Sequence, residues 1–282
     1  FEIQNGFVVG SVKSQLIGNK IKLPFPSVGA TENILMASVL AKGETKISNA
    51  AREPEIEDLS NCLIKMGAKI EGHGTKTILV QGVTNLKKAE HEIIADRIVA
   101  GTYIIAALML NSALEINNFN TIYLKSLIDI LKKMGAKLKV SKNSIKVSKG
   151  SKLKSTSLST SPYPGFPTDL QAQLMSLMCI SDGKSKIKET IFENRFMHVP
   201  ELNRLGANIT VEKDTATIIG NQTFKGAQVM ASDLRASISL VLAAMNANGQ
   251  TTLNRVYHLD RGYENIEKTL GSLGAKIKRQ KN

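Results

Sequence analysis

One short motif recurs four times along the chain and limits what the chain can fold into. A glycine followed by alanine and an alternating apolar pattern stands at Gly67, Gly135, Gly206 and Gly274, with spacings of 68, 71 and 68 residues. A fixed period of this length indicates a fold assembled from repeated supersecondary units. A second set of Gly or Asn residues recurs with nearly the same spacing, at Gly43, Asn111, Gly183 and Gly249. We call these residues the second marker.

Each repeat has the pattern of two helices and several strands. An apolar helical segment comes first and ends at the second marker, as helices commonly end at a left-handed Gly or Asn. A strand, a second helix ending at the Gly-Ala motif, and two strands with period-two alternation follow. The first helices are predicted at residues 29–41, 96–110, 169–180 and 233–247, and the second at 56–66, 123–134, 198–205 and 263–273. This alternation predicts an α/β fold built by internal repetition of units of about 70 residues.

The repeats do not begin cleanly at the first residue. Residues 1–23 have the pattern of closing strands from a preceding unit, and the sequence does not start with methionine. We therefore expect four helix pairs and the tail of a fifth unit, in a processed chain or an incomplete record of a longer one.

Composition narrows the class of protein. Apolar residues make up 42%, and no apolar run reaches the roughly 18 residues of a membrane span. The formal net charge is +13, but 29 of 37 basic residues are scattered lysines without interleaved aromatics, which disfavours a nucleic-acid surface and suits small anionic substrates. Cys62 and Cys179 lie in apolar helical segments and are expected to be buried free thiols. The sequence shows no metal-ligating constellation.

Two early loops each allow a ligand role and a structural one. Ser27, Val28 and Gly29 form a small stretch at a helix start, where free N–H groups favour a phosphate; Ser27 as a plain N-cap is the alternative. Arg52 lies among acidic residues before a second helix, where it either pairs locally or contacts a ligand.

A stiff loop precedes the third repeat's first helix. Three prolines fall within residues 162–167, and each restricts the backbone. The loop delivers Asp169 either as a helix cap or as a carboxylate held to accept a proton from a substrate hydroxyl. His198 and His258 are weaker acid–base candidates, with packing as the alternative.

Arginine is scarce, and three of the eight arginines stand at junctions between predicted elements: Arg195, Arg235 and Arg261. Arg97 occupies the equivalent place in another repeat. A guanidinium grips carboxylate and phosphate through a planar fork, so forks converging from related units would hold a small polyanion. The alternative is that each pairs with its neighbouring acid, these being Glu193, Asp233 and Asp260.

Seven segments together resemble one family. They read PSVGATENILMA, NAAREPEIEDL, ADRIVAGTY, YPGFPTDLQAQ, ETIFENRFMHVPEL, GAQVMASDLRASISLVLA and YHLDRGYENIE. In this order, across essentially the whole chain, they are similar to the UDP-N-acetylglucosamine enolpyruvyl transferases.

The resemblance implies two domains of three βαβαββ units with the active site between them. Residues 1–94 would be the remainder of the N-terminal-side domain, and residues 95–282 the three-unit C-terminal-side domain. The implied reaction moves an enolpyruvyl group from phosphoenolpyruvate to the 3-hydroxyl of UDP-N-acetylglucosamine and releases phosphate, the first committed step of peptidoglycan synthesis, in the cytoplasm. The resemblance implies no cofactor, no metal, no nucleic-acid partner and no membrane, and leaves the oligomeric state open.

The resemblance also assigns residues. Asp169 matches the carboxylate that takes the hydroxyl proton. The substrate-binding matches are Ser27, Val28, Gly29, Ile191, Arg195, Asp233, Arg235 and Arg261, with Ile191 contacting the sugar nucleotide through its backbone and the arginines surrounding phosphoenolpyruvate. Phe25 lies in the same stretch as Ser27, but a side-chain contact from it is not expected.

The chain departs from the family at its start. The family's early Lys-Asn pair and its mobile loop with a reactive Cys and an Arg have no match, and neither Cys62 nor Cys179 lies in such a loop. The isolated chain is therefore expected to be nearly inactive. A non-catalytic remnant that binds UDP-sugar weakly and a basic nucleic-acid-binding repeat protein are the alternatives, and salt-dependent oligonucleotide binding would distinguish the latter.

Overall fold

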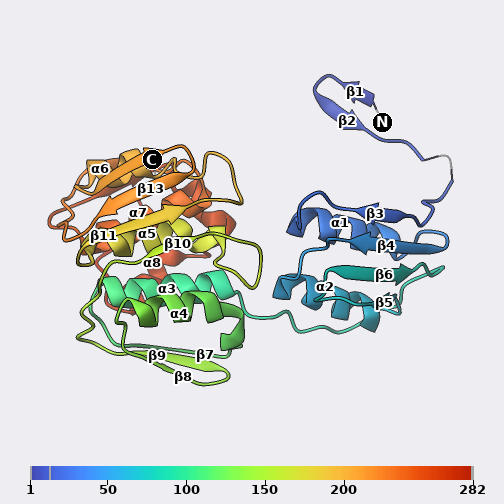
Figure 1. Ribbon diagram of the computed structural model, residues 1–282, viewed down its shortest axis with the longest axis horizontal. Coiled ribbons are helices and arrows are strands. Elements are labelled where there is room, and N and C mark those ends of the chain that lie inside the picture. Colours follow the sequence, from blue (N-terminus) through green and yellow to red (C-terminus); the bar gives the residue numbers. More distant parts are fainter. Residues whose placement is uncertain (1, 13, 281–282) are drawn as a thin grey trace. The chain divides into compact units, whose positions relative to one another are not determined.

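The computed structural model describes residues 2–12 and 14–280, and the chain divides into two compact units, Phe1–Ile94 and Ala95–Asn282 (Figure 1). Both units contain the same arrangement, in which helices pack on one face of a small mixed sheet. The repeat predicted from the sequence is therefore present in three dimensions.

The first unit contains a hairpin and one full repeat. Strands β1 (Glu2–Gln4) and β2 (Phe7–Val9) pair antiparallel. The repeat follows as β3 (Lys20–Lys22), α1 (Val28–Ser38), β4 (Glu44–Ser48), α2 (Pro54–Lys65), β5 (Lys69–Glu71) and β6 (Thr77–Gln81). The sheet order is β3-β4-β6-β5, with β3 and β4 parallel and the other pairs antiparallel.

The second unit holds three further copies. The first is α3 (Arg97–Met109), β7 (Leu114–Asn117), a 3₁₀ turn η1 (Thr121–Leu124), α4 (Lys125–Lys133), β8 (Leu138–Val140) and β9 (Ser144–Val147). The second is β10 (Ser157–Ser159), the 3₁₀ turn η2 (Thr168–Leu170), α5 (Gln171–Ile180), β11 (Lys184–Lys188), α6 (Val199–Arg204), β12 (Asn208–Glu212) and β13 (Thr215–Ile219). The third is β14 (Gln228–Met230), α7 (Leu234–Asn246), β15 (Thr252–Asn254), the 3₁₀ segment η3 (Val256–Arg261) and α8 (Ile266–Ser272).

The sheets repeat the same topology. Order β10-β11-β13-β12 reproduces that of the first unit, and β14 pairs parallel with β15 as β3 does with β4. In the second unit the helices lie between the sheets, and α5 packs against α3 and α7 (Figure 1). That interior is why α3 and α5 are buried almost all round, with Ile104, Leu174 and Leu177 fully inaccessible.

The repeated glycines end helices for a conformational reason. Gly67 follows α2 at φ 102°, and the three equivalent glycines adopt the same left-handed region. This region is open to Gly and disfavoured for residues with a Cβ. At the second marker position Asn111 replaces Gly at φ 46°, the substitution that this region tolerates best.

Helix starts differ among the copies. Side-chain caps begin α1, α3 and α7, from Ser27, Asp96 and Asp233 respectively. Before α5 the chain instead forms η2, whose N-cap position is Pro167 and which has no side-chain cap.

Two predictions about the strands were wrong. Residues 20–22 are the first strand of the first full repeat rather than the end of a preceding one, because they pair with β4. The strands β10 and β14 precede their helices, as the βαβαββ units implied by the resemblance require, although the residue pattern alone did not locate them. Residues 275–280 form no strand, although the Gly-Ala motif predicted one, since no described strand pairs with them.

Candidate functional site

The proline-rich loop carries Asp169 between two buried anchors. The N–H of Ser161 donates to the Phe166 carbonyl at 3.0 Å, which closes the loop on itself. Phe166 and Leu170 are 4% and 0% exposed, so the residues between them cannot move freely. A cis peptide bond joins Tyr163 to Pro164.

Asp169 does not cap the helix that follows it. Its Oδ1 accepts from Nη2 of Arg195 at 2.5 Å, and its Oδ2 accepts from Nη2 of Arg235 at 3.0 Å. The carboxylate side chain is 41% exposed, whereas the two arginines are 14% and 18% exposed. Two guanidinium groups from different repeats therefore meet on one accessible carboxylate. We call Asp169, Arg195 and Arg235 the acid–arginine cluster.

Charge dominates the electrostatics of this cluster. Burial alone would raise the pKa of the Asp169 carboxyl, but Arg235, Arg195 and Arg97 outweigh it and hold that pKa below its usual value. Burial likewise opposes the charge of Arg235, yet Asp169 raises the pKa of that guanidinium. The carboxylate is thus ionised and already partnered.

The local pairings considered for the arginines are wrong for the cluster. Arg195 and Arg235 reach Asp169 rather than Glu193 and Asp233. Asp233 instead caps α7, its Oδ1 accepting from the N–H groups of Arg235 and Ala236 at 2.9 and 3.0 Å. This cap orients the helix turn that presents Arg235.

Arg261 lies elsewhere among the described residues. It is exposed at the end of η3, and its side chain makes no hydrogen bond or ion pair with any residue that the structure describes. Its neighbour Asp260 pairs with Arg279, at 2.7 and 2.9 Å. The structure does not bring Arg261 into contact with the acid–arginine cluster.

Several residues at the cluster were not among the predicted site residues. The Arg97 guanidinium lies 5.7 Å from the Tyr163 ring centre, and the Arg195 guanidinium lies 5.1 Å from that of Phe192. Gln173 donates to the Asp169 carbonyl at 2.9 Å, which fixes the backbone behind the carboxylate. The repeat position of Arg97 was the one sequence signal that could have placed it here.

The two histidines differ in setting. His198 is 1% exposed, with Nε2 3.3 Å from the sulfur of Met175, and burial lowers its pKa to about 4. His198 is therefore a neutral interior residue at pH 7. His258 packs on Tyr257, with ring centres 4.3 Å apart.

Ser27, Val28 and Gly29 belong to the first unit. Ser27 caps α1, its Oγ accepting from the N–H of Ala30 at 3.3 Å, so the structural role is present. The N–H groups of Val28 and Gly29 donate to no group in the described part of the chain. They are the free first-turn donors that an anion requires.

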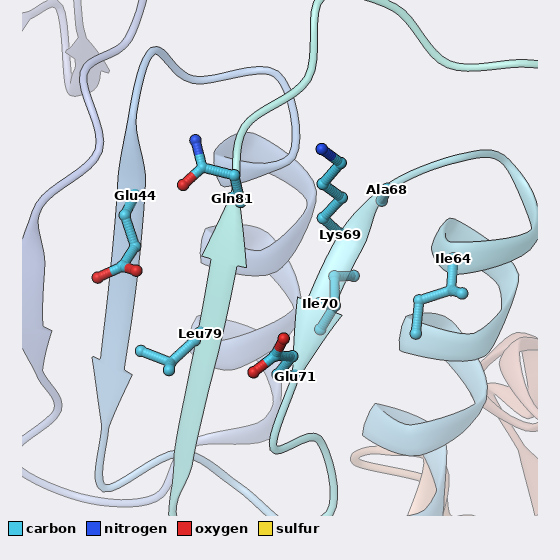
Figure 2. A pocket seen from close by; sticks show the side chains of 8 residues that line it. All are labelled: Glu44, Ile64, Ala68, Lys69, Ile70, Glu71, Leu79 and Gln81. Atoms are coloured by element: carbon cyan, nitrogen blue, oxygen red, sulfur yellow. The ribbon is translucent and has the colours of Figure 1, made fainter.

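A cavity of about 390 Å³ opens on the β4–β6–β5 sheet of the first unit (Figure 2). Its lining includes Glu44, Lys69 and Gln81 and none of the predicted site residues. It therefore does not represent the predicted site.

Within residues 2–12 and 14–280, no group of three or more His, Cys, Asp or Glu side chains is placed to hold a metal ion. No helix in that same part of the chain has the length and apolarity to cross a membrane.

Comparison with known proteins agrees with this architecture. The profile of the EPSP synthase (3-phosphoshikimate 1-carboxyvinyltransferase) family matches residues 2–270. The enolpyruvyl transferase NikO from Streptomyces tendae superposes with a TM-score of 0.83 at 28% identity, over 90% of this chain and 61% of that one. EPSP synthase from Acinetobacter baumannii shares the fold at 19% identity, with a TM-score of 0.74 over 95% of this chain and 64% of that one.

Curated relatives are nearer in sequence. UDP-N-acetylglucosamine 1-carboxyvinyltransferase from Pelagibacter ubique is 52% identical, over 99% of this chain and 67% of its own length. UDP-N-acetylglucosamine 1-carboxyvinyltransferase 2 from Mesorhizobium japonicum is 53% identical, over 98% and 66%. The chain thus spans about two thirds of the length of these relatives. By profile, sequence and fold, it belongs to the EPSP synthase family of enolpyruvyl transferases, and within that family to the UDP-N-acetylglucosamine 1-carboxyvinyltransferases.

Proposed function

We propose that the protein transfers the enolpyruvyl group of phosphoenolpyruvate to the 3-hydroxyl of UDP-N-acetylglucosamine and releases phosphate. The observation that carries the proposal is the acid–arginine cluster, in which one accessible carboxylate meets two guanidinium groups from different repeats. The relatives' names give the acceptor sugar nucleotide and the carboxyvinyl group that is transferred. A role in peptidoglycan synthesis, and with it in cell-wall formation, cell shape and division, in the cytoplasm, belongs to the same proposal.

The cluster suggests how the base becomes active. With both arginines bound to it, Asp169 is a weak base, because its pKa lies below the usual value. An anionic substrate that takes over Arg195 and Arg235 would release the carboxylate and raise its proton affinity. Asp169 could then accept the proton of the sugar hydroxyl as the hydroxyl oxygen adds to C2 of phosphoenolpyruvate and C3 takes up a proton. Loss of phosphate from C2 and of a proton from C3 would then restore the double bond.

The other predicted contacts complete the proposal. Arg261 would join the arginines that hold phosphoenolpyruvate, with Asp233 beside them. The free N–H groups at Val28 and Gly29, with Ser27, would contact the nucleotide diphosphate. Residues 1–94 would be the remainder of the N-terminal-side domain, and residues 95–282 the three-unit domain on the C-terminal side.

The thiol that the family carries on a mobile loop is not supplied by either cysteine here. Cys62 lies in α2, and Cys179 is fully buried in α5, where burial raises its pKa to about 12. We therefore propose that the 282 residues alone turn over little substrate.

The test uses the protein expressed from the complete reading frame that encodes these residues. Phosphate release should require both substrates, and mass spectrometry should find the enolpyruvyl ether of the sugar nucleotide. The variant Asp169→Asn should turn over about 10²- to 10⁴-fold more slowly, the usual contribution of a positioned acid–base group. Near-normal turnover would reduce Asp169 to a structural residue. Saturable UDP-N-acetylglucosamine binding without any turnover would support the alternative of a non-catalytic scaffold.

A further inference from the structure

Glu189 is a buried carboxylate to which no catalytic or binding role is assigned above. It follows β11 directly and is 5% exposed. A buried carboxylate without a cation is costly unless hydrogen bonds replace its lost hydration. No Lys, Arg or His pairs with it among the described residues, so only hydrogen bonds can offset the cost of burying the Glu189 side chain.

Four donors surround this carboxylate. Oε1 accepts from Oγ1 of Thr160 at 2.8 Å and from the backbone N–H groups of Ile191 and Phe192 at 2.9 and 3.1 Å. Oε2 accepts from Oγ1 of Thr168 at 2.9 Å. Four hydrogen bonds to one buried side chain restrict its position, so this set is a rigid junction.

The donors come from two loops that both reach the acid–arginine cluster. Thr168 directly precedes Asp169 at the end of the proline-rich loop. Ile191 and Phe192 begin the turn that carries Arg195, and the Phe192 ring lies 5.1 Å from that guanidinium. Glu189 therefore ties together the chain segments that present the carboxylate and one of its two arginines.

A second layer of hydrogen bonds supports the junction. Oγ1 of Thr160 also accepts from the N–H of Thr190 at 2.8 Å, and Oγ1 of Thr190 donates to the Thr160 carbonyl at 2.6 Å. Thr160 belongs to the strand side of the loop and Thr190 to the turn. The two segments are thus joined at their origins as well as at Glu189.

We propose that Glu189 is a positioning residue, which holds the Asp169 loop and the Ile191 turn in one fixed geometry for catalysis. The kinetic part of this inference rests on the proposed function. The junction also refines the predicted backbone contact of Ile191. Its N–H is taken by Glu189, whereas its carbonyl accepts from no described group, so the carbonyl is the backbone atom left available for that contact.

The kinetic test changes the junction one bond at a time. Thr168→Val removes the donor to Oε2, while Thr168→Ser keeps it. Glu189→Gln replaces one acceptor oxygen by a donor, and Glu193→Gln makes the same chemical change at an exposed glutamate nearby. We expect Thr168→Val and Glu189→Gln to lower kcat about 10- to 100-fold, the cost of misplacing a reacting group by about 1 Å.

The controls separate positioning from folding. Thr168→Ser and Glu193→Gln should keep wild-type kcat, and all four variants should melt cooperatively. Glu189→Gln should also raise the KM for the sugar nucleotide, because it loosens the Ile191 turn, whereas Thr168→Val should act on kcat. An equal loss in Thr168→Ser and Thr168→Val, or wild-type kcat in Thr168→Val, would overturn the inference.

A second readout does not depend on turnover. Hydrogen exchange at the amides of Ile191 and Phe192 should quicken at least tenfold in Glu189→Ala relative to Glu193→Ala. Unchanged protection would refute the junction even in an active enzyme. Quickened exchange in a protein that transfers no enolpyruvyl group would retain the junction and reject the proposed reaction.

Discussion

Asp169 occupies the two arginines that an anionic substrate would need, so the structure predicts competition between them. Substituting Asp169 by Asn keeps the size of the side chain and removes its charge. Arg195 and Arg235 then lack their anion and repel each other. We expect inorganic phosphate, as a probe of this anion site, to bind Asp169→Asn more tightly than the wild-type chain, although the same variant loses turnover.

The size of the effect follows from the two contacts. Each is a charge-assisted hydrogen bond, with a net contribution of about 1.5 kcal/mol at the low end of the usual range. Because Asp169 is 41% exposed, we halve the pair for solvent screening, which leaves about 1.5 kcal/mol in total. This corresponds to roughly tenfold tighter phosphate binding.

Isothermal titration of the 282-residue chain with phosphate, at pH 7 and low salt, measures the difference. Asp129→Asn is the matched control, because it removes one negative charge from a carboxylate that is 56% exposed in α4 and pairs with Lys125. Its phosphate affinity should equal that of the wild type. An unchanged or lower affinity in Asp169→Asn would mean that the carboxylate does not compete for the arginines, and the activation of the base proposed above would be wrong.

Three further predictions follow from particular residues. Arg261→Lys in the complete protein should raise the KM for phosphoenolpyruvate about tenfold, because the variant loses one charge-assisted hydrogen bond. Its affinity for the sugar nucleotide, measured in a binding titration, should be unchanged. An unaltered KM would remove Arg261 from the site. Burial lowers the pKa of His198 to about 4, whereas the ordinary pKa is about 6.5. As pH falls through this window, the unfolded chain takes up a proton before the folded chain does, so the free energy of unfolding should drop by about 3 kcal/mol. Urea unfolding of His198→Leu should lack this part of the pH dependence. Gly101→Ala should lower the free energy of unfolding by about 1–3 kcal/mol through overpacking, because its Cβ would stand 2.7 Å from Cδ1 of Leu170; an equally stable variant would show that Leu170 moves aside freely.

The sequence predicted the parts of the fold that single residues determine. Helix ends at Gly67 and Gly135 were correct because those positions demand a left-handed backbone, which the residue type itself reveals. Strand β10, with the sequence Ser-Leu-Ser, was missed because three residues are too few to show a period. It exists through pairing with β11, and that partner lies outside any local window.

The site was predicted less completely for the same reason. Asp169 and Arg235 are 66 residues apart, and local sequence offers Asp233 as an equally plausible partner for Arg235. Only the packing of α5 against α7 decides between them. Glu189 escaped notice because its four donors are backbone and hydroxyl groups, which leave no charge pattern in the sequence.

The start of α5 differs from the starts of the corresponding helices in the other repeats, because no side chain caps it. In α1, α3 and α7 a serine or aspartate caps the first turn, whereas α5 has no such cap and the acid before it, Asp169, binds two arginines. Selection for heat resistance alone, without selection for catalysis, should therefore introduce a capping side chain before α5 sooner than it alters the starts of α1, α3 and α7.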